Sequence, residues 1–229
     1  MQTKTNLKID WATHEAAKFA CENFHYTKKI PVNKLVKIGA WENKKFIGVV
    51  IFGVGASAVL HRQFNLSRFE VCELVRVALT DHITPVSRII SIALKFLKKS
   101  NPNLKICVSF ADPSQNHHGG IYQAGNWIYT GKSSKTIEYF YNNDWRHVTD
   151  IFKRLKKEQI KLLKKREKEG KYRYIMPLDD QIKKKLKLIS LPYPKRVTSK
   201  DNVALVVQTK EGGVNPTVTL QNKEVSNAS

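Results

Sequence analysis

The residues best suited to bind an anion lie where an expected strand ends and a helix begins. Thr84 and Pro85 are a typical helix cap followed by a first-turn proline, while Ser87 adds a hydroxyl donor and Arg88 a cation. The amides of a first helical turn lack partners inside the helix, and the positive end of the helix dipole attracts negative charge. Together with Arg76 on the preceding strand, this segment could hold a cofactor that carries a diphosphate.

The same residues also fit a purely structural role. Many amphipathic helices begin with Thr-Pro, and Arg76 could simply pair with Glu73 or Glu70. The local sequence leaves both interpretations open.

Apolar residues recur along the first 150 residues with alternating strand and helix periods. This alternation indicates an α/β fold of the mixed α+β kind, in which helices flank a central mixed sheet. The expected elements are a two-stranded hairpin over 35–53 with its turn at 42–45, strands at 71–79, 104–111 and 127–129, and a helix over 86–99.

The charge of the chain indicates a polyanionic partner. Its 229 residues carry a formal net charge of +21, from 40 Lys and Arg against 19 Asp and Glu. Phosphate contacts release counterions, so double-stranded DNA is the expected partner. An anionic membrane is the competitor, but no apolar run approaches the roughly 20 residues of a spanning helix. The start, MQTKTNLKIDW, does not resemble a secretory signal, and we expect a cytoplasmic protein with no membrane contact.

The three cysteines form no CxxC pair. Cys72 and Cys107 lie in apolar strand-like runs, which is typical of free core thiols in a reducing compartment. We therefore expect no catalytic cysteine.

Positive charge is concentrated in residues 153–200, which hold 18 Lys and Arg against 5 Asp and Glu. Apolar residues over 144–169 follow helical spacing with Gly170 as a stop, and a second short helix is expected after Pro177 with Asp179 as its cap. We expect a catalytic domain over 1–150, a basic helical DNA-binding extension over 151–200, and a disordered tail over 201–229. A solvated charged face and a membrane-surface helix are the alternatives for the extension.

The order of the expected elements resembles the GNAT acetyltransferase fold. In that fold a hairpin leads to a strand, a CoA-binding helix, another strand, and a helix that ends in a Tyr-x-x-Gly-aromatic turn. Tyr122, Gly125 and Trp127 in YQAGNW look like a variant of this turn. The usual glycine-rich loop is replaced by HITPVSRI, so the cofactor contacts implied there fall on Ser87, Arg88 and the nearby backbone.

Four segments resemble the Mom family of phage DNA-modification proteins, over roughly residues 20–145. They are HYTKKIP at 25–31, GVVIFGVGA at 48–56, ELVRVALTDHITPVSRIISIAL at 73–94 and SFADPSQNHHGGIYQAGNWIYTG at 109–131. The resemblance implies an enzyme that converts adenine in DNA to N6-carbamoylmethyladenine and so protects phage DNA from host restriction. It also implies acetyl-CoA as the carbon donor and iron as the metal.

The resemblance also implies the site residues. The catalytic and metal-binding positions fall on His25, Tyr26, Asp112 and Tyr122, and the acetyl-CoA contacts on Arg76 and Ser87. A histidine, a carboxylate and phenol oxygens suit non-haem iron better than zinc. Without the resemblance, Asp112 before Pro113 is more typical of a turn, and the other three of core or surface positions. His117 and His118 lie in a glycine-rich loop and are expected to face solvent or phosphate.

The exocyclic amine of adenine lies inside the duplex, so the base must be flipped out or already unpaired. Trp127, Tyr129 and Phe24 are candidate surfaces on which it could stack. Two other functions remain open: conventional GNAT acetylation of a protein or small-molecule amine, and DNA binding without catalysis. A homodimer also remains open.

Overall fold

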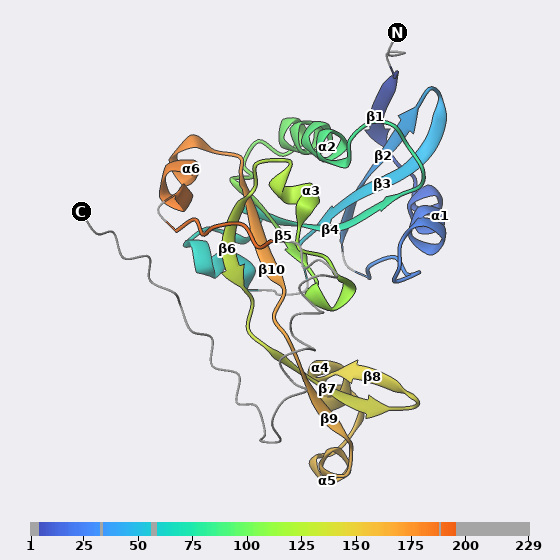
Figure 1. Ribbon diagram of the computed structural model, residues 1–229, viewed down its shortest axis with the longest axis vertical. Coiled ribbons are helices and arrows are strands. Elements are labelled where there is room, and N and C mark those ends of the chain that lie inside the picture. Colours follow the sequence, from blue (N-terminus) through green and yellow to red (C-terminus); the bar gives the residue numbers. More distant parts are fainter. Residues whose placement is uncertain (1–4, 33, 56–58, 188, 196–229) are drawn as a thin grey trace, which may run out of the picture. The chain divides into compact units, whose positions relative to one another are not determined.

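A seven-stranded mixed sheet flanked by helices forms the core of the protein (Figure 1). This computed structural model describes residues 5–32, 34–55, 59–187 and 189–195. The expected α/β architecture is confirmed, while the tail expected over 201–229 lies outside the described residues. No helix in these ranges is long and apolar enough to cross a membrane.

The strands of the main sheet follow the order β1-β2-β3-β4-β5-β10-β6. They are β1 (Leu7–Trp11), β2 (Leu35–Glu42), β3 (Lys45–Gly53), β4 (Val71–Leu79), β5 (Ile106–Ala111), β10 (Tyr172–Pro177) and β6 (Ile128–Lys132). All neighbours are antiparallel except β4 and β5, which are parallel. The predicted hairpin is confirmed as β2 and β3, and its turn at Asn43 and Lys44 has the positive φ values, 51° and 67°, that a tight hairpin turn requires.

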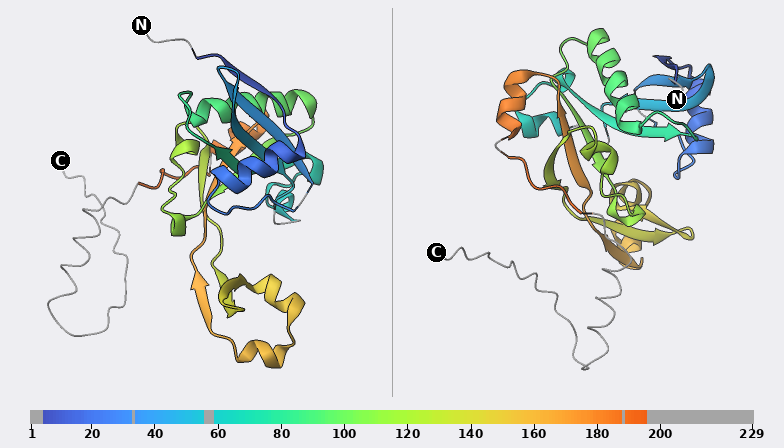
Figure 2. Two further views of the ribbon diagram at one scale, coloured as in Figure 1. Left: turned by 90° about the vertical axis from the view of Figure 1, so that its right-hand side faces the viewer. Right: turned by 45° about the horizontal axis from the view of Figure 1, so that its top comes forward.

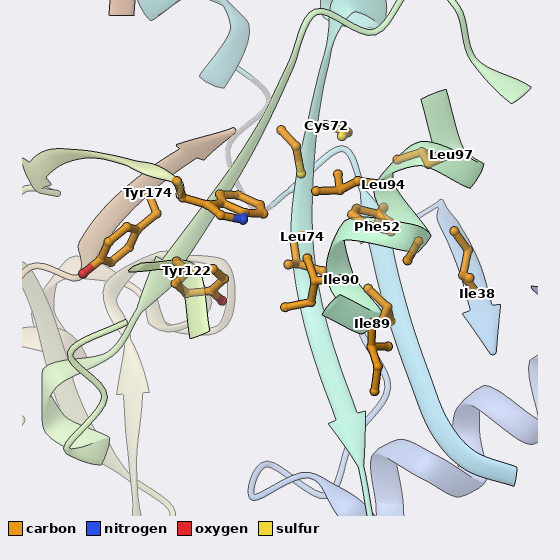
Figure 3. Close-up of a cluster of buried hydrophobic side chains, with 14 of the residues drawn as sticks. Ile38, Phe52, Cys72, Leu74, Ile89, Ile90, Leu94, Leu97, Tyr122 and Tyr174 are labelled. Atoms are coloured by element: carbon orange, nitrogen blue, oxygen red, sulfur yellow. The ribbon is translucent and has the colours of Figure 1, made fainter. Parts of the chain in front are cut away.

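Two long helices cover opposite faces of the sheet. Along β3, Val49 and Ile51 pack with α1 (His14–Phe24), whereas Val50 and Phe52 pack with α2 (Val86–Ser100). The predicted helix over 86–99 is thus confirmed. Its apolar stripe is buried against the sheet (Figure 3), and each large aliphatic side chain of such a stripe contributes about 1.5–3 kcal/mol when fully buried.

A third apolar cluster lies around β5. It joins Leu60 of a 3-10 turn, η1 (Leu60–Phe64), to Ile106, Ile175 and Leu186. Leu186 belongs to α6 (Asp180–Lys187), the second short helix predicted from the sequence. Asp179 caps it as expected, because its Oδ1 accepts hydrogen bonds from the amides of Gln181 and Ile182 at 3.0 Å each.

The helix predicted over 144–169 is wrong. Together with residues 136–143, this segment forms a small lobe with its own sheet, which is inserted in the chain between β6 and β10 (Figures 1 and 2). Its elements are β7 (Thr136–Tyr141), β8 (Asp144–His147), α4 (Val148–Arg154), α5 (Lys157–Lys161) and β9 (Lys165–Lys168). Asn142 and Asn143 adopt positive φ values of 51° and 59° and turn the chain into a β7–β8 hairpin, so helical spacing is realised only in α4 and α5.

The chain then returns to the main sheet. Gly170, expected to stop a helix, lies instead against the backbone of Ser133, where any side chain would collide. After it, β10 pairs with both β5 and β6, so Tyr172–Pro177 belongs to the core sheet and not to an appended helical extension. The described residues up to Pro194 form one compact unit.

The expectation of free thiols in the core is confirmed. Cys21, Cys72 and Cys107 are all buried and free.

Candidate active site

The parallel strands β4 and β5 pair over only three residues and then part. Their last pair is Glu73 with Val108. Beyond this point lies a cavity of about 1140 Å³, lined by the rest of β4, the end of β5, the short helix α3 (Gly120–Gln123) and the inner side of the lobe. Figure 3 shows Tyr122 of α3 between Tyr174 and β4.

The four side chains that the family resemblance singles out all line this cavity. His25 is the C-terminal cap residue of α1 and Tyr26 follows it; Asp112 comes directly after β5, and Tyr122 lies on α3. The ring of Tyr26 meets His117 edge-on with centroids 5.7 Å apart, which joins the N-terminal segment to the loop after β5. His117, which we expected outside the site, therefore belongs to its lining, and His118 does not.

His25 is held in one protonation state and one tautomer. Burial, and then the positive charge of Arg76 and the nearby His117, lower the pKa of His25 to about 4, so its ring is neutral at pH 7. The backbone amide of Thr27 donates to Nδ1 at 3.1 Å, and the Thr27 hydroxyl lies 2.9 Å from the same nitrogen. Because an amide can only donate, Nδ1 is the acceptor and the proton resides on Nε2.

Asp112 is buried and fully engaged. Its Oδ1 accepts from the amide and hydroxyl of Ser114 at 3.0 and 2.6 Å, and its Oδ2 lies 3.3 Å from Lys168 Nζ and 3.6 Å from Lys171 Nζ. Burial by itself raises the pKa of Asp112, but Ser114 and the two ammonium groups outweigh it and hold the pKa below its usual range. The carboxylate therefore stays ionised and ties the lobe to the core.

Tyr122 ends a short chain of hydroxyl groups. Ser109 Oγ lies 2.8 Å from the Tyr122 hydroxyl and 2.9 Å from the carbonyl oxygen of Leu74. Since Ser109 has one proton and a carbonyl can only accept, the arrangement that satisfies all three groups has Tyr122 donating to Ser109. Burial raises the pKa of Tyr122 to about 12, so its phenol remains protonated.

Arg76 lies on β4 and lines the same cavity. Its Nη1 donates to the carbonyl of Val75 at 3.2 Å, while its buried Nε has no partner among the described residues. Glu70, one of the two carboxylates considered as its partner, instead pairs with Lys105 at 2.6 Å. A guanidinium with an unused buried donor is suited to bind an anionic or carbonyl oxygen in the cavity.

The predicted anion site at the start of α2 differs from expectation. Thr84 is not the helix cap: Pro85 occupies that position, and the Thr84 hydroxyl donates to the buried carboxylate of Glu42 at 2.6 Å. Glu42 also accepts from the amides of Ile83 and Thr84 at 2.7 and 2.8 Å. The first turn of α2 has no side-chain cap. Ser87 and Arg88 lie on this turn and not among the residues that line the cavity.

The donor set as arranged does not fit iron. Both oxygens of Asp112 are engaged, with two ammonium groups beside them, and Nδ1 of His25 is occupied while its Nε2 carries the proton. The Tyr122 phenol is protonated and hydrogen-bonded to Ser109. Over the described part of the chain, no group of three or more His, Cys, Asp or Glu residues could hold a metal ion.

Two of the three candidate stacking residues are wrong. Trp127 and Tyr129 have only 1% and 9% of their surface exposed, because both pack in the main core, and Phe24 packs against the α1 cluster. None of the three lines the cavity. Aromatic spacing in the sequence could not separate core rings from cavity rings, since both kinds occur in the same segments.

The lobe beside the cavity has a strongly basic surface. Six exposed lysines between the start of α4 and the start of β9 have no ion pair within the described ranges: Lys153, Lys156, Lys157, Lys161, Lys164 and Lys165. Two large apolar side chains, Phe152 and Leu162, are 62% and 87% exposed among them. Lys168 and Lys171, which contact Asp112, belong to the same basic segment of the chain. The excess of positive charge in the sequence therefore pointed to part of the cavity lining.

Comparisons with known proteins place this chain in a family. The methylcarbamoylase mom of Escherichia phage Mu is 28% identical over 203 residues, which cover 82% of this chain and 84% of that protein. A putative acetyltransferase from Acinetobacter baylyi ADP1 matches with a TM-score of 0.45 and 10% identity, covering 86% of this chain and 100% of that one. An aminoglycoside acetyltransferase solved with coenzyme A and kanamycin matches with a TM-score of 0.48 and 8% identity, covering 80% and 99%. The model of the Mom protein family matches residues 6–195, a range that includes every residue lining the cavity, and the chain belongs to this family.

Proposed function

We propose that the protein modifies adenine in DNA by placing a carbamoylmethyl group on the exocyclic amine. The observation that carries the proposal is the cavity where β4 and β5 part, which gathers His25, Asp112, Tyr122 and Arg76 from four separate segments. The family membership and the name of the phage Mu relative, a methylcarbamoylase, support the same reaction. Modified adenine in phage DNA would resist host restriction.

The lobe supplies the proposed grip on double-stranded DNA. Lysine side chains bind phosphates without reading bases, and every bound phosphate releases counterions. The exposed lysines of α4 and α5, which form no ion pair within the described ranges, supply such contacts beside the cavity. Because β7 and β9 line the cavity as well, DNA held on the lobe would present an extruded base to it.

Acetyl-CoA is the proposed carbon donor. Joining its methyl carbon to the exocyclic nitrogen of adenine breaks one C–H and one N–H bond and needs a two-electron oxidant, while an ammonia donor supplies the amide nitrogen and displaces coenzyme A as the free thiol. A cavity of about 1140 Å³ exceeds the roughly 300–1000 Å³ typical of a site for one small ligand, which leaves room for a base and a thioester arm together. Arg76 would bind a carbonyl or phosphate oxygen inside it. The uncapped first turn of α2, with Ser87 and Arg88, would hold phosphate beside the amides that Glu42 occupies.

The side chains have distinct proposed roles. Neutral His25 would donate a hydrogen bond from Nε2 to the substrate. Ser109 holds the phenol of Tyr122 in position, and Asp112 holds Lys168 and Lys171 at the cavity wall. Iron, which the family resemblance implies, is not part of the proposal because three of its four implied ligands, His25, Asp112 and Tyr122, are already engaged.

Mass spectrometry of nucleosides from DNA of bacteria that express the chain tests the function. We expect a deoxyadenosine that is heavier by one carbamoylmethyl group, and we expect it to disappear with Asp112→Asn. Asp10→Asn, which changes an exposed carboxylate on β1, is the matched control and should keep the product. Acetylated amines instead would indicate conventional acetylation, while unmodified DNA with tight DNA binding would indicate a binding protein.

A further inference from the structure

Tyr26 is the exposed aromatic ring of the cavity. Three Phe, Tyr or Trp side chains line it within the described residues: Tyr26, Phe110 and Tyr122. Tyr122 is buried in the core with 7% of its surface exposed, and Phe110 packs against the cluster around β5. Tyr26 keeps 51% of its surface exposed.

The ring of Tyr26 is held in place by its neighbours. The imidazole of His25 lies behind it, with centroids 4.3 Å apart and planes inclined by 32°, and His117 meets its edge. The chain turns directly after it, since Lys28 has a positive φ of 51° and donates its amide to the carbonyl of His25 at 3.0 Å. The result is a layered and supported aromatic surface at the cavity.

The hydroxyl of Tyr26, unlike its ring, is not held in place by the neighbouring side chains that the structure describes. The described residues give it no hydrogen bond, whereas the hydroxyl of Tyr122 is fixed by Ser109. The built feature at Tyr26 is the ring.

We propose that Tyr26, backed by His25 and flanked by His117, is the surface on which the extruded adenine stacks. The inference rests on the proposed function, in which adenine must leave the duplex to expose its amine. It assigns Tyr26 a positioning role through its ring, in place of the metal-binding role through its oxygen that the family resemblance implies. Trp127 and Tyr129 cannot serve because they are buried.

Equilibrium binding to two DNA duplexes tests this role. In the first, one adenine faces an abasic position among randomised flanking bases; in the second, that adenine is also removed. The wild type should prefer the first duplex. Base stacking on an aromatic side chain accounts for about 1–3 kcal/mol, so Tyr26→Leu should reduce the ratio of the two affinities by roughly 5- to 150-fold. The reduction cannot exceed the ratio that the wild type itself shows.

The conservative variant separates ring from oxygen. Tyr26→Phe should retain most of the preference for the adenine-bearing duplex, and Phe19→Leu, at a ring of α1 that is 52% exposed and outside the cavity, is the matched control. A loss in Tyr26→Phe as large as in Tyr26→Leu would overturn the proposal in favour of the oxygen. If Tyr26→Leu fails to fold, His117→Ala gives the second measurement and should weaken the same preference.

The outcome is distinguishable from that of the proposed function. A wild type that binds both duplexes equally would overturn the stacking surface even if DNA modification is detected. A preference that depends on the ring of Tyr26 would support it even if no modified nucleoside is found.

Discussion

His25 should resist protonation far below the ordinary range of histidine, and this can be measured as stability. Its pKa is about 4 in the folded protein because burial and the charges of Arg76 and His117 disfavour the imidazolium. In the unfolded chain the ordinary value of about 6.5 applies. Between these values the unfolded state binds the extra proton, so the contribution of His25 is present above pH 6.5 and is lost as the pH falls towards 4.

The magnitude follows from the two pKa values. Relative to pH 7, the wild type should lose about 1 kcal/mol of unfolding free energy at pH 5.5 and about 2 kcal/mol at pH 4.5 through this one group. His25→Gln lacks the titration but shares all other groups. The stability difference between the wild type and the variant should therefore shrink, or reverse, by these amounts on acidification.

Urea unfolding at pH 7, 5.5 and 4.5 measures the difference, and nuclear magnetic resonance of the imidazole reports its pKa and tautomer directly. Arg76→Met should raise the pKa of His25 but leave it below 6.5, because burial is the larger cause. Parallel pH profiles for the wild type and His25→Gln would refute the reasoning. So would a resonance that shows the proton on Nδ1.

Three further predictions concern the elements around the site. Glu42→Gln should destabilise the protein by about 1–3 kcal/mol at pH 7, since the NH2 group of glutamine cannot accept and leaves the amide of Ile83 or of Thr84 without its acceptor. The deficit should shrink as the pH falls towards the lowered pKa of Glu42, where the wild type loses its ionised carboxylate as well; equal deficits at pH 7 and 3 in urea unfolding would contradict this. Changing Lys153, Lys157 and Lys161 together to Gln should reduce the slope of log binding constant against log salt concentration by about 0.9 for each phosphate that the variant no longer neutralises. Changing the exposed lysines of α1 and α2, Lys18, Lys95 and Lys99, to Gln should leave this slope unchanged. Ser87→Ala should weaken acetyl-CoA binding about 2- to 10-fold in calorimetry, and an unchanged affinity would move the phosphate contacts away from α2.

Much of the fold could be predicted from local pattern. The hairpin of β2 and β3, the strand β4 and the helix α2 all follow from apolar spacing with Gly, Pro and Asn signals nearby, and these elements are confirmed. The lobe could not be predicted in this way. Its helical spacing over 144–169 was outweighed by a two-residue asparagine turn that forms the β7–β8 hairpin and by the pairing of β7 with β9, which joins residues far apart in the chain.

The place of β10 was also beyond the sequence pattern. A short run rich in charged neighbours looked like part of a basic arm, but its consecutive residues Tyr174 and Ile175 point to opposite faces of the sheet and complete the core on both sides between β5 and β6. Insertion of a lobe between neighbouring strands leaves no local signal, because only the sheet register shows where the chain returns.

For the site, the sequence by itself determined which side chains to consider. It showed the segments around His25, Asp112 and Tyr122, the arginine on β4 and the excess of positive charge. Only the tertiary structure decided what these groups can do. Parting of β4 from β5 creates the cavity, Lys168 and Lys171 neutralise Asp112, Ser109 engages Tyr122, and Thr27 sets the tautomer of His25. Protonation and free donor positions depend on burial and on partners brought from distant segments, which residue spacing does not encode.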